Sequence, residues 1–295
     1  MLPGSMPSLG SLVTVISKPK EKMSKMFGKI KGYLISAKAY AASIIVLALA
    51  IVFWQFAVNA FRIQAYILPS PSLIFESFVT SNIRWGFHLY ITLSEILIGF
   101  LAGAATGIAL GILITYSNAI NKILYPYILF LQLLPKVAVA PIFLIWFGFG
   151  LLPKVAITSI MTFFPMVVAI ASGLQSTPPE LIMLSNSLHA TKWQIFKKIR
   201  LPNSLPYVFD GMKVSMTLAV VGALIGEFVA GDQGIGFVIV MSSHTMDTAA
   251  SFAGILLISV AGIFLYGITL LAERLAVPWY WIPRQEERLK STNSL

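Results

Sequence analysis

Three charged side chains stand inside long apolar stretches and are the first candidates for chemistry. Glu95, Lys136 and Glu227 are flanked on both sides by hydrophobic residues. A charge within a membrane-spanning helix is costly and by default marks a functional site. A structural alternative stays open, with the two glutamates near the outer interface and the lysine extending its amine toward water. Direct contact with a substrate is therefore one of two interpretations.

The sequence lacks the motifs that would make the chain an ATPase or a hydrolase by itself. It contains no G-x-x-x-x-G-K-[ST], H-E-x-x-H or G-x-S-x-G. The glycine-rich run at 231–236 resembles a phosphate loop only superficially, because no strand–helix unit surrounds it. The chain has no cysteine, and its three histidines are far apart in sequence. We expect no catalytic residue, no metal site, no bound cofactor and no nucleic-acid partner.

The composition indicates that the elements carrying these charges are membrane helices. Of the 295 residues, 57% are hydrophobic and 11% are charged, against about 25% charged in soluble domains. Six stretches are long enough to cross about 30 Å of hydrocarbon. We therefore predict an all-α integral membrane protein with six transmembrane helices in a lipid bilayer. The predicted spans are 39–61, 87–115, 123–147, 152–173, 208–230 and 250–272.

The distribution of Lys and Arg predicts the orientation. With the N-terminus in the cytoplasm, cytoplasmic segments hold 17 of these residues and outside loops, including Lys154, hold three. Residues 1–38 are then a basic cytoplasmic tail, 39–274 the membrane domain and 275–295 a cytoplasmic C-terminal tail. Both termini are expected in the cytoplasm.

Two spans carry residues that shape a helix. Gly99, Gly103, Gly107 and Gly111 place one glycine per turn along the second span, a stripe on which another backbone can pack closely. The contact is either within the subunit or with a moving or second subunit. Prolines interrupt the third span at Pro126, Pro135 and Pro141, and the fourth at Pro165. Such breaks favour a path lining or a hinge, so Pro141 and Pro165 join the charged residues as path or gate candidates.

The long cytoplasmic loop 174–207 predicts two short helices with a break between them. Thr177–Glu180 and Thr191–Gln194 both have the pattern of a capping box. The first helix should run over 178–188 and the second over 192–200, ending before Pro202. His189 stands at the break, where a left-handed residue is required. Trp193, Phe196 and Ile199 form an apolar face that fits either a groove of another protein or the bilayer and this chain's own spans.

This loop resembles the "EAA" loop of permease subunits of bacterial ABC importers. Ile199, Leu201 and Pro202 match the end of that motif, whereas Met183 stands at the first Glu-Ala-Ala position and His189 at the glycine position. Further segments are similar to the nitrate, sulfonate and taurine branch, which also includes thiamine-precursor and riboflavin permeases. These segments are Pro135–Pro141 with Trp146–Gly148, Leu68–Pro71, Gly99–Gly111 and Gly234–Gly236, and the resemblance covers about residues 60–281.

The resemblance implies the fold of a type I ABC importer permease in the bacterial inner membrane. It implies that ATP and Mg are bound by a separate ATPase, present in two copies and docked on the loop. The docking residues would be Met183, Ser187, Leu188, His189, Ala190, Thr191, Trp193, Phe196, Leu201 and Pro202. It also implies a second permease copy, a homodimer being the simpler expectation, and a periplasmic binding protein that delivers a small polar nutrient.

A gradient-driven secondary transporter or channel is the alternative function. Such a protein would often show an inverted repeat and ion-coupling carboxylates near the membrane centre. The sequence shows no convincing repeat, and a docking loop would have no role in it.

Overall fold

A computed structural model describes residues 41–116 and 118–280 of the chain, and within these residues every regular element is a helix. Residues 57–278 form one compact unit, and the remaining described residues belong to a second. The first helix is Ala41–Ala60. The others are α2 (Pro71–Thr80), α3 (Trp85–Tyr116), α4 (Asn118–Leu133), the 3-10 turn η1 (Lys136–Val139), α5 (Ala140–Phe147), α6 (Leu151–Gln175), α7 (Pro179–Ser187), α8 (Lys192–Ile195), the π turn η2 (Phe196–Arg200), α9 (Leu201–Ala230), α10 (Ile235–His244) and α11 (Thr248–Ala276). The predicted tail 1–38 and most of the predicted tail 275–295 lie outside the described residues.

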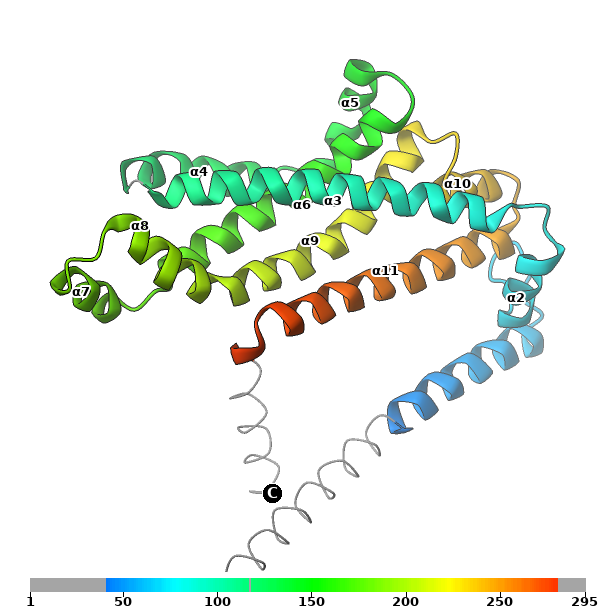
Figure 1. Ribbon diagram of the computed structural model, residues 1–295. Helices are drawn as coiled ribbons and strands as arrows, with labels where there is room; N and C mark the ends of the chain where they lie inside the picture. Colours follow the sequence, from blue (N-terminus) through cyan, green and yellow to red (C-terminus); the bar gives the residue numbers. More distant parts are fainter. Residues whose placement is uncertain (1–40, 117, 281–295) are drawn as a thin grey trace, which may run out of the picture. The chain divides into compact units, whose positions relative to one another are not determined.

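The centre of the larger unit is α6, which packs against α3 on one side and α9 on the other (Figure 1). α11 lies along α9, and α10 contacts α9 and α11. Their shared core contains Ile96, Met166, Ala219, Ile235 and Ile258, all buried. In water, the burial of apolar surface stabilises such a core by about 25 cal/mol per Å². In a bilayer, close packing of small residues takes over that role.

The glycine stripe of α3 is what lets α6 approach so closely. A Cβ atom at Gly99 would lie 2.4 Å from the Thr158 Cβ, and one at Gly111 would lie 2.7 Å from the Ile170 Cβ. A Cβ at Gly107 would lie 2.8 Å from the Met166 Cβ. The stripe therefore faces α6 of the same chain along its whole length.

Among the residues that the structure describes, five helices are long and apolar enough to span a membrane, and one bent pair of helices could supply a sixth span. The predicted third span is not a single helix, because the chain bends by 84° between α4 and the η1–α5 pair. The bend lies at Pro135, whereas Pro126 sits inside α4 without breaking it. Pro141 occupies the first turn of α5, where its missing N–H is not needed.

The prediction that Pro165 breaks the fourth span is wrong. α6 runs without interruption from Leu151 to Gln175 with Pro165 inside it. Close to the proline, α6 contacts a neighbouring helix through Ser215 Oγ of α9, which donates to the Thr162 carbonyl oxygen at 3.0 Å. Packing against neighbouring helices and small local adjustments of the backbone allow a proline to stay inside a membrane helix.

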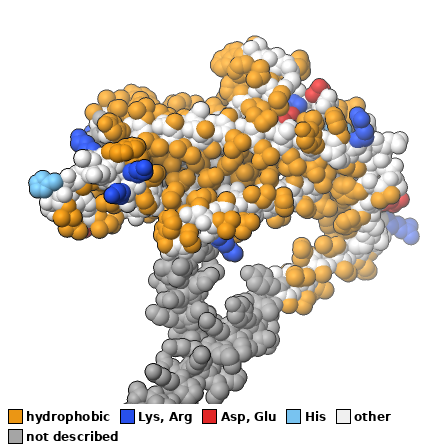
Figure 2. All heavy atoms as spheres, viewed as in Figure 1, with side chains coloured by type: hydrophobic (Ala, Val, Ile, Leu, Met, Phe, Trp, Pro, Cys, Tyr) orange, Lys and Arg blue, Asp and Glu red, His pale blue; other side chains and the backbone are white. Residues whose placement is uncertain are grey.

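The surface of the unit is largely apolar, as expected for a protein that is surrounded by lipid. Hydrophobic side chains cover most of the face shown in Figure 2, and acidic side chains appear on it only in small groups. α2 lies beside the N-terminal end of α11. It begins with the Ser70 hydroxyl accepting from the Leu73 N–H at 3.4 Å and Pro71 at the first helical position.

Candidate functional site

The break between α7 and α8 is a closed hydrogen-bonded turn. His189 adopts φ 55°, in the left-handed region. The Ala190 N–H donates to the Ser185 carbonyl oxygen at 3.0 Å, and the His189 N–H donates to the Asn186 carbonyl oxygen at 3.0 Å. These two bonds define a Schellman motif, which satisfies the last carbonyls of α7. The predicted left-handed residue at His189 is therefore present.

The two predicted capping boxes have different outcomes. At α8 the box is complete, because Thr191 Oγ1 accepts from the Gln194 N–H at 3.3 Å and the Thr191 N–H donates to Gln194 Oε1 at 2.8 Å. At α7 the prediction is wrong: Pro178 occupies the cap position without a side-chain bond. The Thr177 hydroxyl donates instead to the carbonyl oxygen of Leu174, at the end of α6.

The prediction that the second loop helix ends before Pro202 is also wrong. α8 continues through η2 directly into α9, so residues 192–230 form one helix. A proline ring collides with the carbonyl four residues earlier in an α-helix. The wider π turn, in which the Leu201 N–H donates to the Phe196 carbonyl oxygen, lets the helix pass Pro202. Leu201 and Pro202 thus lie inside this continuous helix, at the start of α9.

The tip of the loop exposes large apolar side chains. Met183 is 69% exposed, Leu188 72% and Trp193 67%. The Trp193 ring stacks on Phe196 with 5.6 Å between ring centroids, and Phe196 packs against the core. We call Met183, Leu188 and Trp193 the loop tip. A rigid helical tip with an apolar face is suited to a groove of another protein.

A second candidate site is a buried polar cluster at the opposite end of the unit. Lys154 Nζ lies 3.0 Å from Glu95 Oε1, and these residues are only 2% and 1% exposed. Lys154 also lies 3.6 Å from Asp232, whose side chain is largely exposed. The sequence placed Lys154 in an outside loop, which is wrong, because it lies in the first turn of α6 and is buried. A carboxylate in an apolar span requires a basic partner. That requirement could have indicated that Lys154 is buried beside Glu95.

Glu227 belongs to the same cluster through α3. Its carboxylate accepts from Thr92 Oγ1 at 2.6 Å and from the backbone N–H of Gly236. The Ile235 N–H donates to Thr92 Oγ1 at 2.8 Å, and the Gly234 N–H donates to His88 Nδ1 at 3.1 Å. Three successive backbone N–H groups before and in α10 are thus held by α3 and α9.

This arrangement gives the glycine-rich run a structural role. Gly234 has φ 109°, and a Cβ there would lie 2.1 Å from Glu227 Oε1. Only glycine permits both the left-handed backbone and the close approach of the carboxylate. The run closes over the Glu227 carboxylate.

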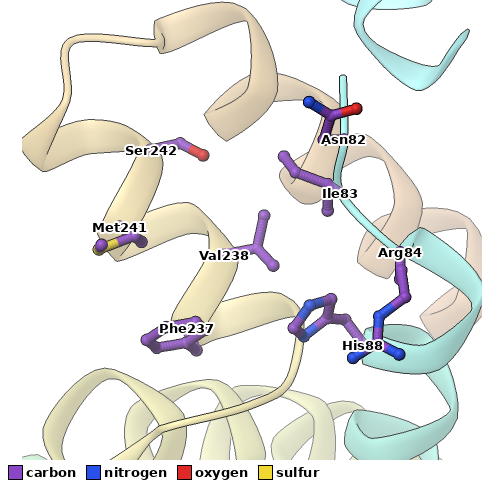
Figure 3. A pocket seen from close by; sticks show the side chains of 8 residues that line it. All are labelled: Asn82, Ile83, Arg84, His88, Phe237, Val238, Met241 and Ser242. Atoms are coloured by element: carbon purple, nitrogen blue, oxygen red, sulfur yellow. The ribbon is translucent and has the colours of Figure 1, made fainter. Parts of the chain in front are cut away.

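A small hollow opens beside this cluster between the segment before α3 and α10 (Figure 3). It is lined from one side by Asn82, Ile83, Arg84 and His88, and from the other by Phe237, Val238, Met241 and Ser242. Its volume is about 250 Å³, below the roughly 300–1,000 Å³ of ligand pockets. The His88 and Phe237 rings stack with centroids 6.3 Å apart, so the hollow belongs to the packing between α3 and α10.

The remaining path candidates lie apart from the glutamates. Lys136 begins η1, donates to the Gln132 carbonyl oxygen at 2.6 Å and lies over the Phe164 ring at 5.4 Å. Pro165 is adjacent to that ring in α6, and Pro141 is exposed. The structure thus joins Glu95 and Glu227 in one cluster and places Lys136 at the bend of the broken span. Within the described residues no group of three acidic or histidine side chains could hold a metal.

Sequence reasoning missed a third polar contact, between α9 and α11. Lys213 Nζ lies 3.1 Å from Glu273 Oε2 and 2.6 Å from Asp210 Oδ1. Glu273 is 1% exposed, so its charge is compensated by the lysine. Every buried lysine within α6 and α9 is therefore paired with carboxylates.

Taken together, the apolar helices, the exposed loop tip and the paired charges are typical of a membrane transport permease. Residues 103–276 match the family of binding-protein-dependent transport system inner membrane components, and the chain belongs to this family. It is the multi-pass inner-membrane permease subunit of an ABC importer and is not itself an enzyme. The gradient-driven alternative is thereby set aside.

Three relatives illustrate the range of the family. The chain is 33% identical over 217 residues to the formylaminopyrimidine transport permease protein ThiX of Halalkalibacterium halodurans, covering 73% of this chain and 87% of the relative. It is 34% identical over 238 residues to the riboflavin transport system permease protein RibX of Chloroflexus aurantiacus, covering 80% and 88%. It is 29% identical over 279 residues to the putative aliphatic sulfonates transport permease protein SsuC of Bacillus subtilis, covering 94% and 95%.

A solved structure supports the fold. The MetNI methionine ABC transporter in an inward-facing conformation contains a chain that superposes with a TM-score of 0.55 at 17% identity, covering 63% of this chain and 93% of that chain. The predicted type I ABC importer permease fold is therefore confirmed.

Proposed function

We propose that this permease works as a homodimer with two cytoplasmic ATPase subunits docked on its two 174–207 loops. ATP and Mg would be bound by those ATPases, and a periplasmic binding protein would dock on the outer loops. The observation that carries this proposal is the loop tip, whose apolar side chains stand exposed on a turn closed by its own hydrogen bonds. A preformed tip loses little conformational entropy on docking, which favours tight binding.

The continuous helix 192–230 supports a mechanism of alternating access. Its cytoplasmic end carries Trp193, and its other end carries Glu227. At 1.5 Å per residue, 39 residues span about 58 Å, which exceeds the hydrocarbon thickness. When the ATPases close on ATP, a displacement of the loop would move this helix as one body and act on the polar cluster. Opening outward would then require the bonds from Thr92 and Gly236 to Glu227 to break or to move together.

The charges within the spans favour an uncharged substrate over a sulfonate or nitrate. Lys154 and Lys213 are paired with carboxylates, and Lys136 donates to a carbonyl oxygen. An anion would find little unpaired positive charge along such a path. Two relatives above 30% identity carry names that specify a formylaminopyrimidine and riboflavin. We therefore propose a small polar nitrogen heterocycle as the substrate, with a sulfonate or taurine as the alternative.

Reconstitution into vesicles tests both parts of the proposal. The permease, its ATPase and its binding protein are combined, and ATP hydrolysis is measured with a pyrimidine, riboflavin or taurine as ligand. We expect hydrolysis to rise only when the binding protein carries a heterocycle. Stimulation by taurine alone would overturn the substrate class, whereas loss of uptake on dissipating ion gradients at constant ATP would overturn the ATP-driven mechanism.

Docking is tested separately by the Leu188→Ala/Trp193→Ala double variant. We expect about 30-fold weaker capture of the ATPase, the loss typical of one central interface side chain. Val79→Ala is the matched control, since Val79 in α2 is 86% exposed and lies away from the loop. Equal ATPase capture by the double variant and the wild type would contradict docking at the loop tip.

A further inference from the structure

A groove of about 530 Å³ lies between the cytoplasmic ends of α3 and α6 and the helices of the 174–207 loop. Its apolar lining includes Ile112, Leu174 and Ile195. Tyr116 and Trp193 border it and are mostly exposed. We call it the inner groove. A cavity of this size is within the range of small-molecule sites, which are apolar with a few placed polar groups.

Two cationic side chains line the inner groove without a counter-ion. Lys192 and Arg200 form no ion pair within the part of the chain that the structure describes. Arg200 Nε is buried and has no acceptor among these residues. A buried donor without an acceptor is destabilising, more so when it is charged. The groove therefore presents charge and hydrogen-bonding capacity that the described chain leaves unused.

The setting of the groove favours a lipid over a soluble ion. α3 ends at Tyr116 and α6 ends at Gln175, so the groove opens where the spans meet water. Tyrosine and tryptophan concentrate at that boundary, and basic residues concentrate on its cytoplasmic side. Basic pockets between helix ends on this side bind anionic lipid headgroups. The apolar lining would contact the glycerol and the first acyl carbons of a lipid. A free phosphate has no apolar part to fill this lining.

We propose that the inner groove binds an anionic phospholipid, with its headgroup phosphate between Lys192 and Arg200. Trp193 and Phe196 line the same groove and also belong to the predicted ATPase-docking residues. A lipid bound there would fix the position of the loop tip. The lipid composition of the membrane would then regulate how well the loop transmits movement to the spans.

Native mass spectrometry of the purified full chain tests lipid binding without any ATPase. The delipidated protein is titrated with phosphatidylglycerol or with phosphatidylcholine carrying the same acyl chains. A basic residue near an anionic headgroup contributes about fivefold in affinity, so two contribute about 30-fold. We expect tight binding of phosphatidylglycerol and about 30-fold weaker binding by Lys192→Gln/Arg200→Gln.

Lys197→Gln/Lys198→Gln is the matched control. It removes the same charge from the segment between Lys192 and Arg200, but both lysines are exposed and neither lines the groove. We expect it to keep the preference for phosphatidylglycerol. Equal weakening by the two double variants, or equal binding of both lipids by the wild type, would overturn the proposal.

Two further measurements separate lipid binding from a folding defect and a lipid from a soluble anion. The single variant Lys192→Gln alters only an exposed side chain, so about fivefold weaker binding is expected even if the double variant folds poorly. Displacement of phosphatidylglycerol by millimolar inorganic phosphate would instead assign the groove to a soluble anion and contradict the lipid proposal.

Discussion

Gly103→Ala tests the packing on which the central helices depend. A Cβ at this position would lie 1.8 Å from Thr162 Oγ1 and 2.4 Å from the Ser159 carbonyl oxygen. Carbon contacts prefer about 3.5 Å. The hydroxyl can rotate away, but the carbonyl belongs to the backbone of α6, so α3 and α6 must separate by about 1 Å to restore a normal contact.

The expected change in the free energy of unfolding is the sum of two opposing effects. Overpacking of this kind costs about 1–3 kcal/mol, and we take about 3 kcal/mol because a backbone atom is in the way. Replacing glycine by alanine inside a helix gains about 1 kcal/mol. The net destabilisation is therefore about 2 kcal/mol. For a unit of about 220 residues, that shift lowers the melting temperature by about 4–8 °C.

The assay is thermal unfolding in mild detergent, followed by the loss of the monodisperse peak in size-exclusion chromatography. Gly267→Ala is the control, because Gly267 lies inside α11 and nothing is within 4 Å of an added Cβ. It should melt at or above the wild-type temperature. Gly103→Leu should fail to assemble. A Gly103→Ala protein that melts with the wild type would refute the close approach of α3 and α6.

Three further changes probe the polar cluster and the loop. Lys154→Met should destabilise the protein by about 3–5 kcal/mol, because it leaves Glu95 buried and unpaired, and Glu95→Gln added to it should restore much of the yield of monodisperse protein. His189→Gly should preserve ATPase binding, whereas His189→Val should weaken it, since a β-branched residue at φ 55° costs about 1–3 kcal/mol. Trp193→Ala should weaken ATPase capture without changing the melting temperature, whereas Phe196→Ala should lower both, because Phe196 also packs against the core.

Each of these changes has an outcome that would contradict its reasoning. A Lys154→Met protein as stable as the wild type would show that the ion pair adds nothing. Identical ATPase binding by the glycine and valine variants at His189 would show that the turn between α7 and α8 does not hold the tip. A lower melting temperature of Trp193→Ala would show that this ring stabilises the fold and is not free for docking.

The sequence predicted the local structure of the loop well where the signals are local. The complete capping box at Thr191 joins residues three positions apart, and the backbone bonds around the left-handed His189 join residues at most five positions apart. The same reasoning failed at Thr177 because the hydroxyl donates to the end of α6 instead. It failed at Pro202 because a π turn, which no propensity predicts, widens the helix just before the proline.

The polar cluster could not be assembled from the sequence because its contacts are long-range. Glu95 and Lys154 are 59 positions apart, and Thr92 and Glu227 are 135 apart. Counting charges by loop assigned Lys154 to the outside, although the predicted span 152–173 includes it, and did not predict its pairing with Glu95. A sequence shows that a buried charge needs a partner, but only the packing of α3, α6 and α9 shows which residue provides it.

Site-specific cross-linking tests most directly whether the 174–207 loop is the ATPase-docking element. The chain has no cysteine, so Leu188→Cys introduces a single thiol at the loop tip and Val79→Cys introduces one in α2. Membranes containing the permease, its ATPase and its binding protein are treated with a maleimide–succinimidyl ester reagent that joins the thiol to a partner's lysine. We predict an adduct between the permease and the ATPase for Leu188→Cys and none for Val79→Cys. An ATPase that co-purifies with both variants but is captured only through Val79→Cys, or through neither, would contradict docking at this loop.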